Sequence, residues 1–182
     1  MRRAFFTWIF HAFGWKVVGR PPDLDKYVIV VAPHTSNIDF FVGLPIKYMY
    51  PGFEPRFLAK NSLFKIPVVG WFLKSIGGYA VNRSKHTKLV DQIVEVFEKE
   101  ERFIMTITPE GTRSYVPKWR TGFYWVAVEA KVPIVMAGFD YERKIVEFVD
   151  PFDPSGDVDT DIEKMMAYFR TMKGKHPELG VR

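Results

Sequence analysis

Short apolar runs rich in branched side chains recur along the chain, and each of them predicts a buried β-strand. The clearest run covers residues 27–31 and is ended by Pro33. Strands are predicted over residues 28–31, 56–59, 78–81, 103–108, 133–139 and 144–149. The last two segments lie close enough together to form a hairpin-like pair, so the sheet is expected to be mixed.

Segments with the 3.6-residue period of an amphipathic helix lie between or after these strands. They cover residues 89–99, 121–130 and 161–172, and the polar segment 151–161 is predicted to be a loop. The apolar stripe of the first helix consists of Leu89, Ile93, Val96 and Phe97. Strands that alternate with helices predict an α/β fold, with a mixed, largely parallel central sheet flanked by helices and functional residues at the carboxyl ends of strands. A length of 182 residues suits a single domain over residues 1–182.

The N-terminal segment, residues 1–18, has apolar residues at helical spacing with cations at both ends. Its apolar residues are Phe6, Ile9, Phe10 and Phe13, with Trp8 and Trp15 beside them. This pattern predicts an amphipathic helix in a membrane interface, with rings among the headgroups and cations toward anionic lipid. The alternative is a helix that packs on the domain, and both can hold together. No apolar run reaches the length that spans a bilayer, and no cleavage site for a signal peptide follows.

The composition narrows the classes of partner. Lysine and arginine number 26 against 21 acidic residues, so the net charge is +5 and phosphates, acidic proteins or anionic lipids are plausible partners. An aromatic content of 16% indicates a greasy surface or an apolar ligand channel. Cysteine is absent, which excludes disulfides and a cysteine nucleophile and is compatible with a reducing compartment. The four histidines have no partners at metal-ligand spacing, so no metal site is predicted.

A histidine and an aspartate follow the first predicted strand, five residues apart. Between them, Thr35, Ser36 and Asn37 are residue types that cap a helix N-terminus, so Asp39 is expected on the first turns of the next element. A carboxylate there can bond one imidazole nitrogen of His34 and leave the other free as a base. Such a base removes a proton from a hydroxyl at neutral pH.

Polar residues also follow three other predicted strands. Lys60 follows residues 56–59, Arg83 follows residues 78–81, and a polar turn at 110–113 follows residues 103–108. If these strands are neighbours in one sheet, the side chains converge with His34 on a single edge. A base beside several cations is what a phosphate-bearing alcohol would require.

The turn that follows the strand at 103–108 consists of Glu110, Gly111, Thr112 and Arg113. Gly111 allows a sharp turn or a close approach to a ligand, and the hydroxyl of Thr112 and the planar cation of Arg113 suit a phosphate. Glu110 could bond a substrate hydroxyl or hold an arginine in place. The alternative for each cation is an ordinary strand-ending turn with a solvated side chain.

Four segments in this order resemble the sequence blocks of the glycerolipid acyltransferases, the HxxxxD family, and in particular its lysophosphatidate (1-acyl-glycerol-3-phosphate) acyltransferases. They are residues 34–39, 78–83, 109–114 and 132–137, all within residues 28–139. The resemblance implies a glycerol-3-phosphate acyltransferase-like fold. It also implies transfer of an acyl group from a coenzyme A or acyl-carrier-protein thioester to a hydroxyl of a lysophospholipid, with no bound cofactor.

The resemblance implies a role for each residue of these blocks. His34 would be the general base, and Asp39 would orient it and stabilise the imidazolium, as in a triad that lacks a serine. The phosphate and glycerol of the acceptor would be bound by Arg83, Glu110, Gly111, Thr112 and Arg113. Lys60 joins them because it ends a strand and because some members have a basic residue there. The block at 132–137 would shape the core or the acyl channel.

Two departures from the family pattern bear on the acceptor. Asn82 stands where many members have an acidic residue, and Thr108 stands where an aromatic or aliphatic residue often precedes Pro-Glu-Gly. Neither change removes a reacting group, but both leave the identity of the acceptor open. We expect a peripheral protein on the cytoplasmic face of a membrane, which it contacts through the N-terminal helix.

Two other functions compete with this interpretation. A lipid-binding or lipid-carrying module without catalysis would keep the pocket, although it has no need of a paired base. A nucleic-acid binder would use the basic charge and the loop at 118–120, where Trp119 could stack on a base. No nucleic acid is expected, because no recognisable binding fold accompanies the charge. Substrate or headgroup contact and a merely solvated surface are the other interpretations of this loop.

Overall fold

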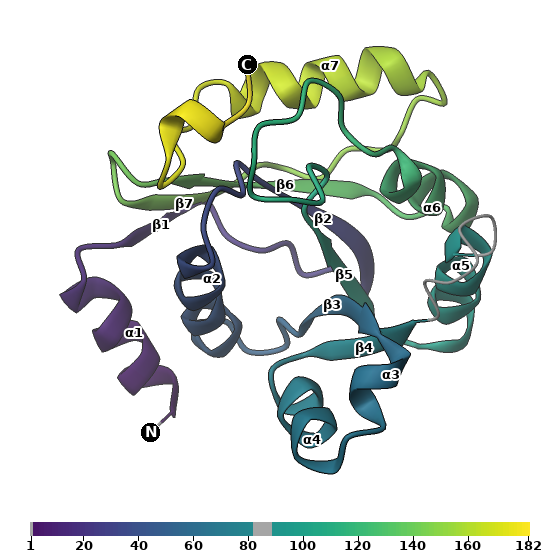
Figure 1. The fold of residues 1–182 in the computed structure, drawn as a ribbon, viewed down its shortest axis with the longest axis horizontal. Coiled ribbons are helices and arrows are strands. Elements are labelled where there is room, and N and C mark those ends of the chain that lie inside the picture. Colours follow the sequence, from purple (N-terminus) through teal and green to yellow (C-terminus); the bar gives the residue numbers. More distant parts are fainter. Residues whose placement is uncertain (1, 82–88) are drawn as a thin grey trace.

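The computed structural model describes residues 2–81 and 89–182, in which seven strands form one sheet (Figure 1). The strands are β1 (Lys16–Val18), β2 (Lys26–Ala32), β3 (Pro55–Lys60), β4 (Gly78–Val81), β5 (Phe103–Ile107), β6 (Ile134–Asp140) and β7 (Ile145–Phe148). Their order is β1-β7-β6-β2-β5-β3-β4. Neighbouring strands are parallel except for β6 and β7, which pair antiparallel. The mixed, largely parallel sheet and the hairpin-like pair are therefore confirmed, and β1 is an addition at the edge.

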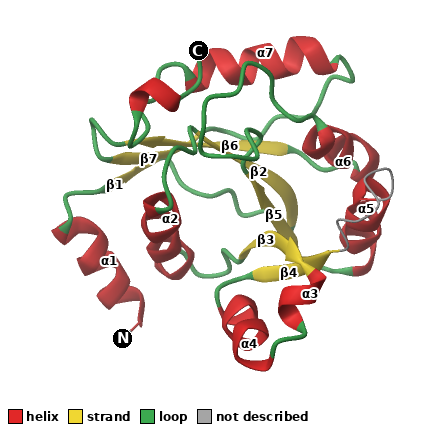
Figure 2. Cartoon of the chain, in the orientation of Figure 1, coloured by secondary structure: helices red, strands yellow, loops and turns green. Residues whose placement is uncertain are grey.

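Helices cover both faces of the sheet (Figures 1 and 2). They are α1 (Arg2–Ala12), α2 (Ile38–Met49), α3 (Asn61–Phe64), α4 (Pro67–Ser75), α5 (Leu89–Lys99), α6 (Gly122–Ala130), α7 (Val158–Phe169) and the 3₁₀ helix η2 (Pro177–Leu179). The prediction of 161–172 for α7 was wrong by three residues at each end. The Asp157 carboxylate accepts a hydrogen bond from the Thr160 amide and so begins the helix inside the predicted loop.

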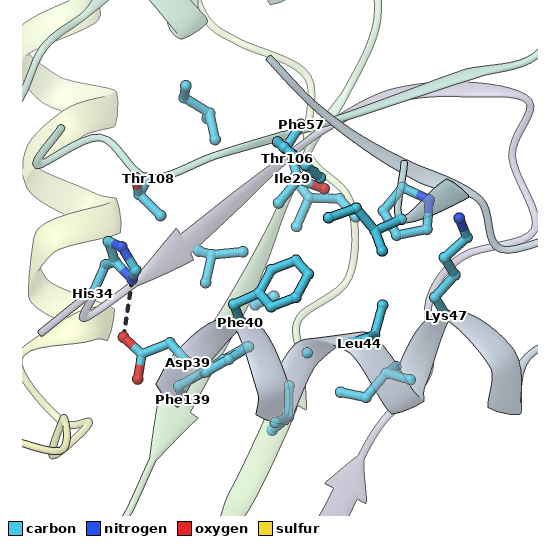
Figure 3. Close-up of a pocket in the computed structure, with 18 of the residues that line it drawn as sticks. Ile29, His34, Asp39, Phe40, Leu44, Lys47, Phe57, Thr106, Thr108 and Phe139 are labelled. Atoms are coloured by element: carbon cyan, nitrogen blue, oxygen red, sulfur yellow. Dashed lines mark hydrogen bonds and ion pairs between the residues drawn. The ribbon is translucent and has the colours of Figure 1, made fainter. Parts of the chain in front are cut away.

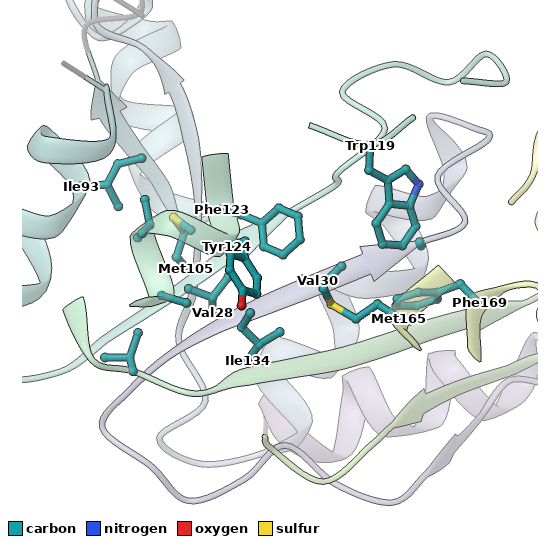
Figure 4. Packing of buried hydrophobic residues seen from close by; sticks show 14 of the residues in the cluster. Val28, Val30, Ile93, Met105, Trp119, Phe123, Tyr124, Ile134, Met165 and Phe169 are labelled. Atoms are coloured by element: carbon teal, nitrogen blue, oxygen red, sulfur yellow. The ribbon is translucent and has the colours of Figure 1, made fainter. Parts of the chain in front are cut away.

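Two apolar cores lie on opposite faces of the sheet, and strand β2 contributes to both because successive side chains point to opposite sides. Val28 and Val30 belong to the core that α5, α6 and α7 cover, which Figure 4 shows. Tyr27 and Ile29 belong to the core that α1 and α2 cover. His34 follows β2 where this strand leaves the sheet.

The N-terminal helix is shorter than the predicted 1–18, because α1 ends at Ala12 and Gly14 turns the chain with φ +81° before β1. Phe10 and Trp15 are buried in the core beneath α2, so the packing interpretation holds for these two rings. Trp8 and Phe13 remain exposed. The same segment therefore anchors to the domain and presents aromatic rings at the surface.

Two helices, α3 and α4, form where the hydrophobic pattern predicts no element. Their large apolar residues are not confined to an inward stripe, since Val68 and Trp71 are exposed. Pro67 at the first position of α4 suits a helix start. A search for inward-facing periodicity therefore misses this pair of helices. No helix within the described residues is long and apolar enough to cross a membrane.

Candidate active site

The carboxyl ends of four parallel neighbouring strands, β2, β5, β3 and β4, share one edge of the sheet, as the predicted convergence requires. His34 follows β2, Glu110 follows β5, and Lys60 is the last residue of β3. Arg83 would follow β4 but lies outside the described residues, as does Asn82.

His34 and Asp39 are hydrogen-bonded, as the five-residue spacing predicts. Nδ1 of His34 lies 2.9 Å from Oδ2 of Asp39, which stands on the first turn of α2 and is only 4% exposed. Figure 3 shows the pair beside the cavity that His34 lines. With the proton on Nδ1 donated to the carboxylate, the other ring nitrogen, Nε2, keeps its lone pair. In this tautomer His34 can act as a base toward a group bound in the cavity.

The predicted capping of α2 by residues 35–37 was wrong in one respect. Asn37 at the N-cap makes no side-chain capping hydrogen bond. The Asp39 carboxylate takes this role instead. Its Oδ2 accepts hydrogen bonds from the backbone amides of Thr35 and Ser36, both at 3.1 Å. A charged acceptor binds these amides more strongly than a neutral amide side chain does, and a negative charge is favoured at a helix N-terminus. Only Ser36 bonds the first turn as expected, through Oγ to the Ile38 amide.

Tyr141 is a further residue of the site, which the sequence analysis missed. Its hydroxyl donates to Oδ1 of Asp39 at 2.6 Å, so both oxygens of the carboxylate are occupied. Burial raises the pKa of Tyr141, and the hydrogen bond to Asp39 raises it further, so the phenol stays protonated and donates. Trp15 packs edge-on against the ring. Tyr141 directly follows β6, but its place beside Asp39 depends on the strand order, which sets β6 next to β2.

Glu110 holds the backbone of the base. Its Oε1 accepts the amide of His34 at 3.0 Å, in place of the hydroxyl or arginine that the sequence suggested as a partner. Its Oε2 is buried and has no hydrogen-bond partner among the described residues. Burial raises the pKa of Glu110, while the hydrogen bond from the His34 amide works in the opposite direction. Glu110 is not among the residues that line the cavity, so the structure shows it as a support of the His34 backbone.

The rest of the predicted phosphate-binding turn lies at the surface, where Thr112 and Arg113 are exposed and Arg113 also lines the cavity. Gly111 adopts φ +63°, and a Cβ there would lie 3.0 Å from Nε of Arg120, so the turn requires glycine. Lys60 is exposed and is not among the residues that line the cavity. The structure therefore brings Arg113 and Glu110 to the base but leaves Lys60 apart.

The stacking role considered for the loop at 118–120 was wrong. Trp119 is buried and packs against Phe169, with ring centroids 5.6 Å apart. A base could not reach its face without opening the core. Lys118 and Arg120 remain exposed, so this loop offers cations without an aromatic platform.

A cavity of 460 Å³ runs from the base between α2 and the sheet (Figure 3). Its walls are largely apolar and come from α2 and five strands; they include Ile29, Val31, Phe40, Leu44, Phe57, Ala137, Phe139, Val146 and Phe148. His34 and Asp39 stand at one end and Lys47 at the other in the close-up. The eight positions between Asp39 and Lys47 span about 12 Å of helix axis. The cavity is shaped for an extended apolar chain whose polar end lies at the base.

Polar side chains also line the cavity, among them Thr106 and Lys47. Thr106 contributes a buried Oγ1 without a hydrogen-bond partner among the described residues. Lys47 is partly buried, and burial followed by the nearby charge of Arg56 lowers the pKa of its amine. Among the described residues, no three His, Cys, Asp or Glu side chains cluster so that they could hold a metal ion.

Comparison with known proteins places this site in a family. Residues 16–139 match the family model described as Acyltransferase, and this range includes His34, Asp39, Glu110 and Arg113. The match covers most of the sheet and the cavity. It stops before α7.

Individual relatives point the same way. The chain is 34% identical to a Saccharomyces cerevisiae 1-acyl-sn-glycerol-3-phosphate acyltransferase over 66% of its own length, but covers only 41% of that protein. It is 27% identical to the Haemophilus influenzae protein of the same name, over 93% of this chain and 78% of the other. The crystal structure of the 1-acyl-sn-glycerophosphate acyltransferase PlsC from Thermotoga maritima superposes with a TM-score of 0.59 at 20% identity, over 96% of this chain and 80% of that one. This last likeness establishes the shared fold.

Proposed function

The chain belongs to the Acyltransferase family, and from that premise we propose that it is an O-acyltransferase that transfers a fatty acyl group from a thioester to a hydroxyl of a lysophospholipid. The named relatives are 1-acyl-sn-glycerol-3-phosphate acyltransferases, which makes such a lysophospholipid the first acceptor to test. The acyl donor is a coenzyme A or acyl-carrier-protein thioester, and no bound cofactor is required.

The observation that carries this proposal is the hydrogen bond between His34 and the buried Asp39 at the mouth of an apolar cavity. Nε2 of His34 accepts the proton of the acceptor hydroxyl as its oxygen forms a bond to the thioester carbonyl carbon. The imidazolium, stabilised by Asp39, then protonates the thiolate as the carbon–sulfur bond breaks. Oxygen, proton and leaving group are all accounted for without a covalent enzyme intermediate.

The cavity binds the acyl chain of the donor, and the residues at its rim bind the acceptor. The apolar walls bind the acyl chain, and burial of each CH₂ contributes about 0.8 kcal/mol. Arg113 lines the cavity near the base and pairs with the phosphate of the acceptor, with Thr112 and Arg83 as its expected partners. Glu110 contributes by holding the His34 amide, and its contact with the glycerol portion stays a prediction from the family resemblance. Lys60 is exposed and does not line the cavity, so it would meet the headgroup only from outside.

Membrane contact follows from the same proposal, because the acceptor resides in a bilayer. The exposed rings of Phe5, Trp8 and Phe13 on and just after α1 would enter the headgroup region while Phe10 anchors the helix to the domain. The protein would then act as a peripheral protein on the cytoplasmic face of the membrane.

The test is release of free thiol from palmitoyl-coenzyme A with lysophosphatidate vesicles, measured for the wild type and His34→Ala. We expect turnover by the wild type and a loss of about 10²–10⁴-fold in the variant, the usual contribution of a general base. His176→Ala is the matched control, since that side chain is half exposed and lies outside the cavity walls. It should retain wild-type turnover.

Residual transfer near the wild-type rate in His34→Ala would refute the base. Silence of both proteins, repeated with acyl-carrier protein and other lysolipids, would favour the lipid-carrying alternative, especially if lysolipid still bound tightly and equally to both proteins.

A further inference from the structure

Helices α3 and α4 present their large apolar side chains to the outside of the molecule. Val68 is 77% exposed and Trp71 is 72% exposed, and Leu63, Ile66 and Phe72 are exposed as well. In α4 the single buried residue is Gly70. The pattern is the reverse of an ordinary surface helix, which buries its apolar stripe against the core.

Glycine at two positions lets the backbone of α4 pack closely against its neighbours, and of the large apolar side chains in α3 and α4 only Phe64 and Leu73 are partly buried. A Cβ at Gly70 would lie 2.5 Å from the carbonyl oxygen of Phe64, so the backbones of α3 and α4 touch there. A Cβ at Gly78, the first residue of β4, would lie 2.8 Å from the carbonyl oxygen of Leu73. These approaches hold α4 against α3 and the sheet edge by its backbone, and Trp71 and Val68 have no place in the interior.

The charges on this surface are mainly positive. Residues 55–81 contain no aspartate or glutamate, and their four cations are Arg56, Lys60, Lys65 and Lys74. Arg56 pairs with Glu54 at 3.0 Å, which leaves the three lysines as the cations of α3, α4 and their margin. The helices on the other side of the sheet differ, since α5 and α7 each carry three acidic residues and one lysine. An anionic surface would attract the molecule by the α4 side and repel it by the α5 and α7 side.

The apolar surface continues on the side of the sheet that holds the cavity. Figure 1 shows α1, α2 and α4 on the side of the molecule away from α7. Ile38 and Phe41 of α2 are exposed, as is Trp8 of α1. Ile76, which follows α4, lines the cavity together with Phe40 of α2. The exposed rings of α4 therefore lie on the far side of the cavity from α1.

We propose that α3 and α4 form a second lipid-docking surface whose occupant is an anionic bilayer, so that α1 and α4 flank the cavity on the membrane. This inference deepens the proposed function and rests on it, because the proposed acceptor resides in a bilayer. An apolar centre of tryptophan, phenylalanine and aliphatic side chains with lysines at its margin suits a headgroup region, where rings lie at the interface and cations meet phosphates. An acidic protein partner would instead need cations at the centre, where this surface has Val68 and Trp71.

Quenching of tryptophan fluorescence by brominated phospholipids tests this placement directly. The full chain is mixed with phosphatidylcholine vesicles with and without phosphatidylglycerol. Trp71→Phe should lose a distinct share of the quenching seen with anionic vesicles. Trp125→Phe is the matched control, because Trp125 is 39% exposed on α6, on the other side of the sheet, and it should leave the quenching unchanged. Equal quenching in wild type and Trp71→Phe would overturn the proposal.

Co-sedimentation gives the affinity. The double variant Val68→Asp/Trp71→Ser should bind anionic vesicles about tenfold more weakly than wild type, since it removes two exposed apolar groups and adds a negative charge. Trp125→Ser should bind like wild type. Unchanged vesicle binding in the double variant would overturn the proposal, as would a wild-type dimer that the double variant abolishes without any change in vesicle binding.

Turnover in detergent micelles separates this inference from the proposed function. The double variant should keep wild-type turnover on micellar lysophosphatidate and lose it on anionic vesicles, because its cavity is intact. Bilayer docking through Trp71 without any turnover would leave the docking surface standing and refute the acyltransferase. Turnover by the wild type together with unchanged vesicle binding of the double variant would support the acyltransferase and refute the docking surface.

Discussion

The two faces of the sheet use their helices in opposite ways. On one face, α5 and α7 bury apolar stripes against β2 and β5 and turn all their acidic residues except Asp161 to solvent. On the other, α2 stands off from the sheet and leaves a cavity, and α1 and α4 expose large rings. One set of strands thus supports a closely packed core under α5 and α7, the closed face, and an apolar cavity beside α2, the open face.

The contrast shows where stability and activity reside. Interiors close-packed to about 0.75 of their volume lose stability with every group removed, whereas a cavity wall that already faces empty space loses little. Substitutions on the α5/α7 face should therefore act on unfolding, and those on the α2 face should act on turnover.

The largest expected effect comes from Phe97→Ala on the closed face. The ring is 2% exposed and packs against Phe103 with centroids 4.9 Å apart. Its loss should cost about 3–5 kcal/mol in the free energy of unfolding. Phe40→Ala, at a cavity-wall ring that is 36% exposed, should cost less than about 1.5 kcal/mol and instead change the preferred acyl chain. Urea unfolding of both variants checks the pair, and equal losses of stability would break the comparison.

The second-largest effect is expected at Asp161, a buried carboxylate on the closed face. Burial by itself would raise its pKa, but hydrogen bonds from Ser155 and the Tyr124 hydroxyl outweigh burial, and the pKa is lowered. A lowered pKa contributes stability that is present above the unfolded value of about 3.9 and is lost as the pH falls through the folded pKa. Asp161→Asn should therefore cost about 1–3 kcal/mol at neutral pH and progressively less below pH of about 4.

Unfolding at both pH values, with the exposed Asp159→Asn as control, tests this assignment. A cost for Asp161→Asn that did not shrink on acidification would show that its charge is not what stabilises the contact between α6 and α7.

Most of the sheet could be predicted from the sequence because inward residues repeat at the period of the element that holds them. The strands around Val28 and Ile134 and the stripe of α5 all follow this rule. It fails for α4, whose apolar residues face outward and whose inner contact is made by the backbone at Gly70. Hydrophobicity alone does not distinguish an apolar residue that is buried in the core from one that faces outward, as in α4.

The site shows the same division. His34 and Asp39 could be found because their spacing and the strand end suffice to bring them together. The partner of Glu110 could not, since nothing in the sequence says that its carboxylate meets the amide of His34, 76 residues earlier. Tyr141 needed the strand order, which places β6 beside β2. Contacts within one turn are encoded locally, and contacts across strands depend on the topology.

On the open face, Tyr141→Phe should reduce turnover about tenfold, which corresponds to about 1.4 kcal/mol of barrier. The variant removes the 2.6 Å hydrogen bond to Oδ1 of Asp39 and leaves the ring against Trp15. Asp39 would then be free to rotate, and the imidazolium would be less well stabilised, so kcat should fall more than KM rises. Stability should change by less than about 1 kcal/mol, since a phenylalanine fills the same space. Tyr27→Phe, whose hydroxyl lies 3.4 Å from the Pro22 carbonyl, is a control that should keep full turnover.

Glu110 completes the comparison from the open face, because its pKa is raised by burial where that of Asp161 is lowered. A raised carboxyl pKa contributes stability that is fully present below the unfolded value of about 4.3 and is lost as the pH rises through the folded pKa. Glu110→Gln keeps an oxygen for the His34 amide and removes this dependence. The variant should therefore gain stability relative to wild type as the pH rises from about 4 to 8, with a difference under about 1 kcal/mol at neutral pH. Guanidinium unfolding at the two pH values measures the change. A variant that instead lost stability at the higher pH would show that the ionised Glu110 carboxylate stabilises the folded protein.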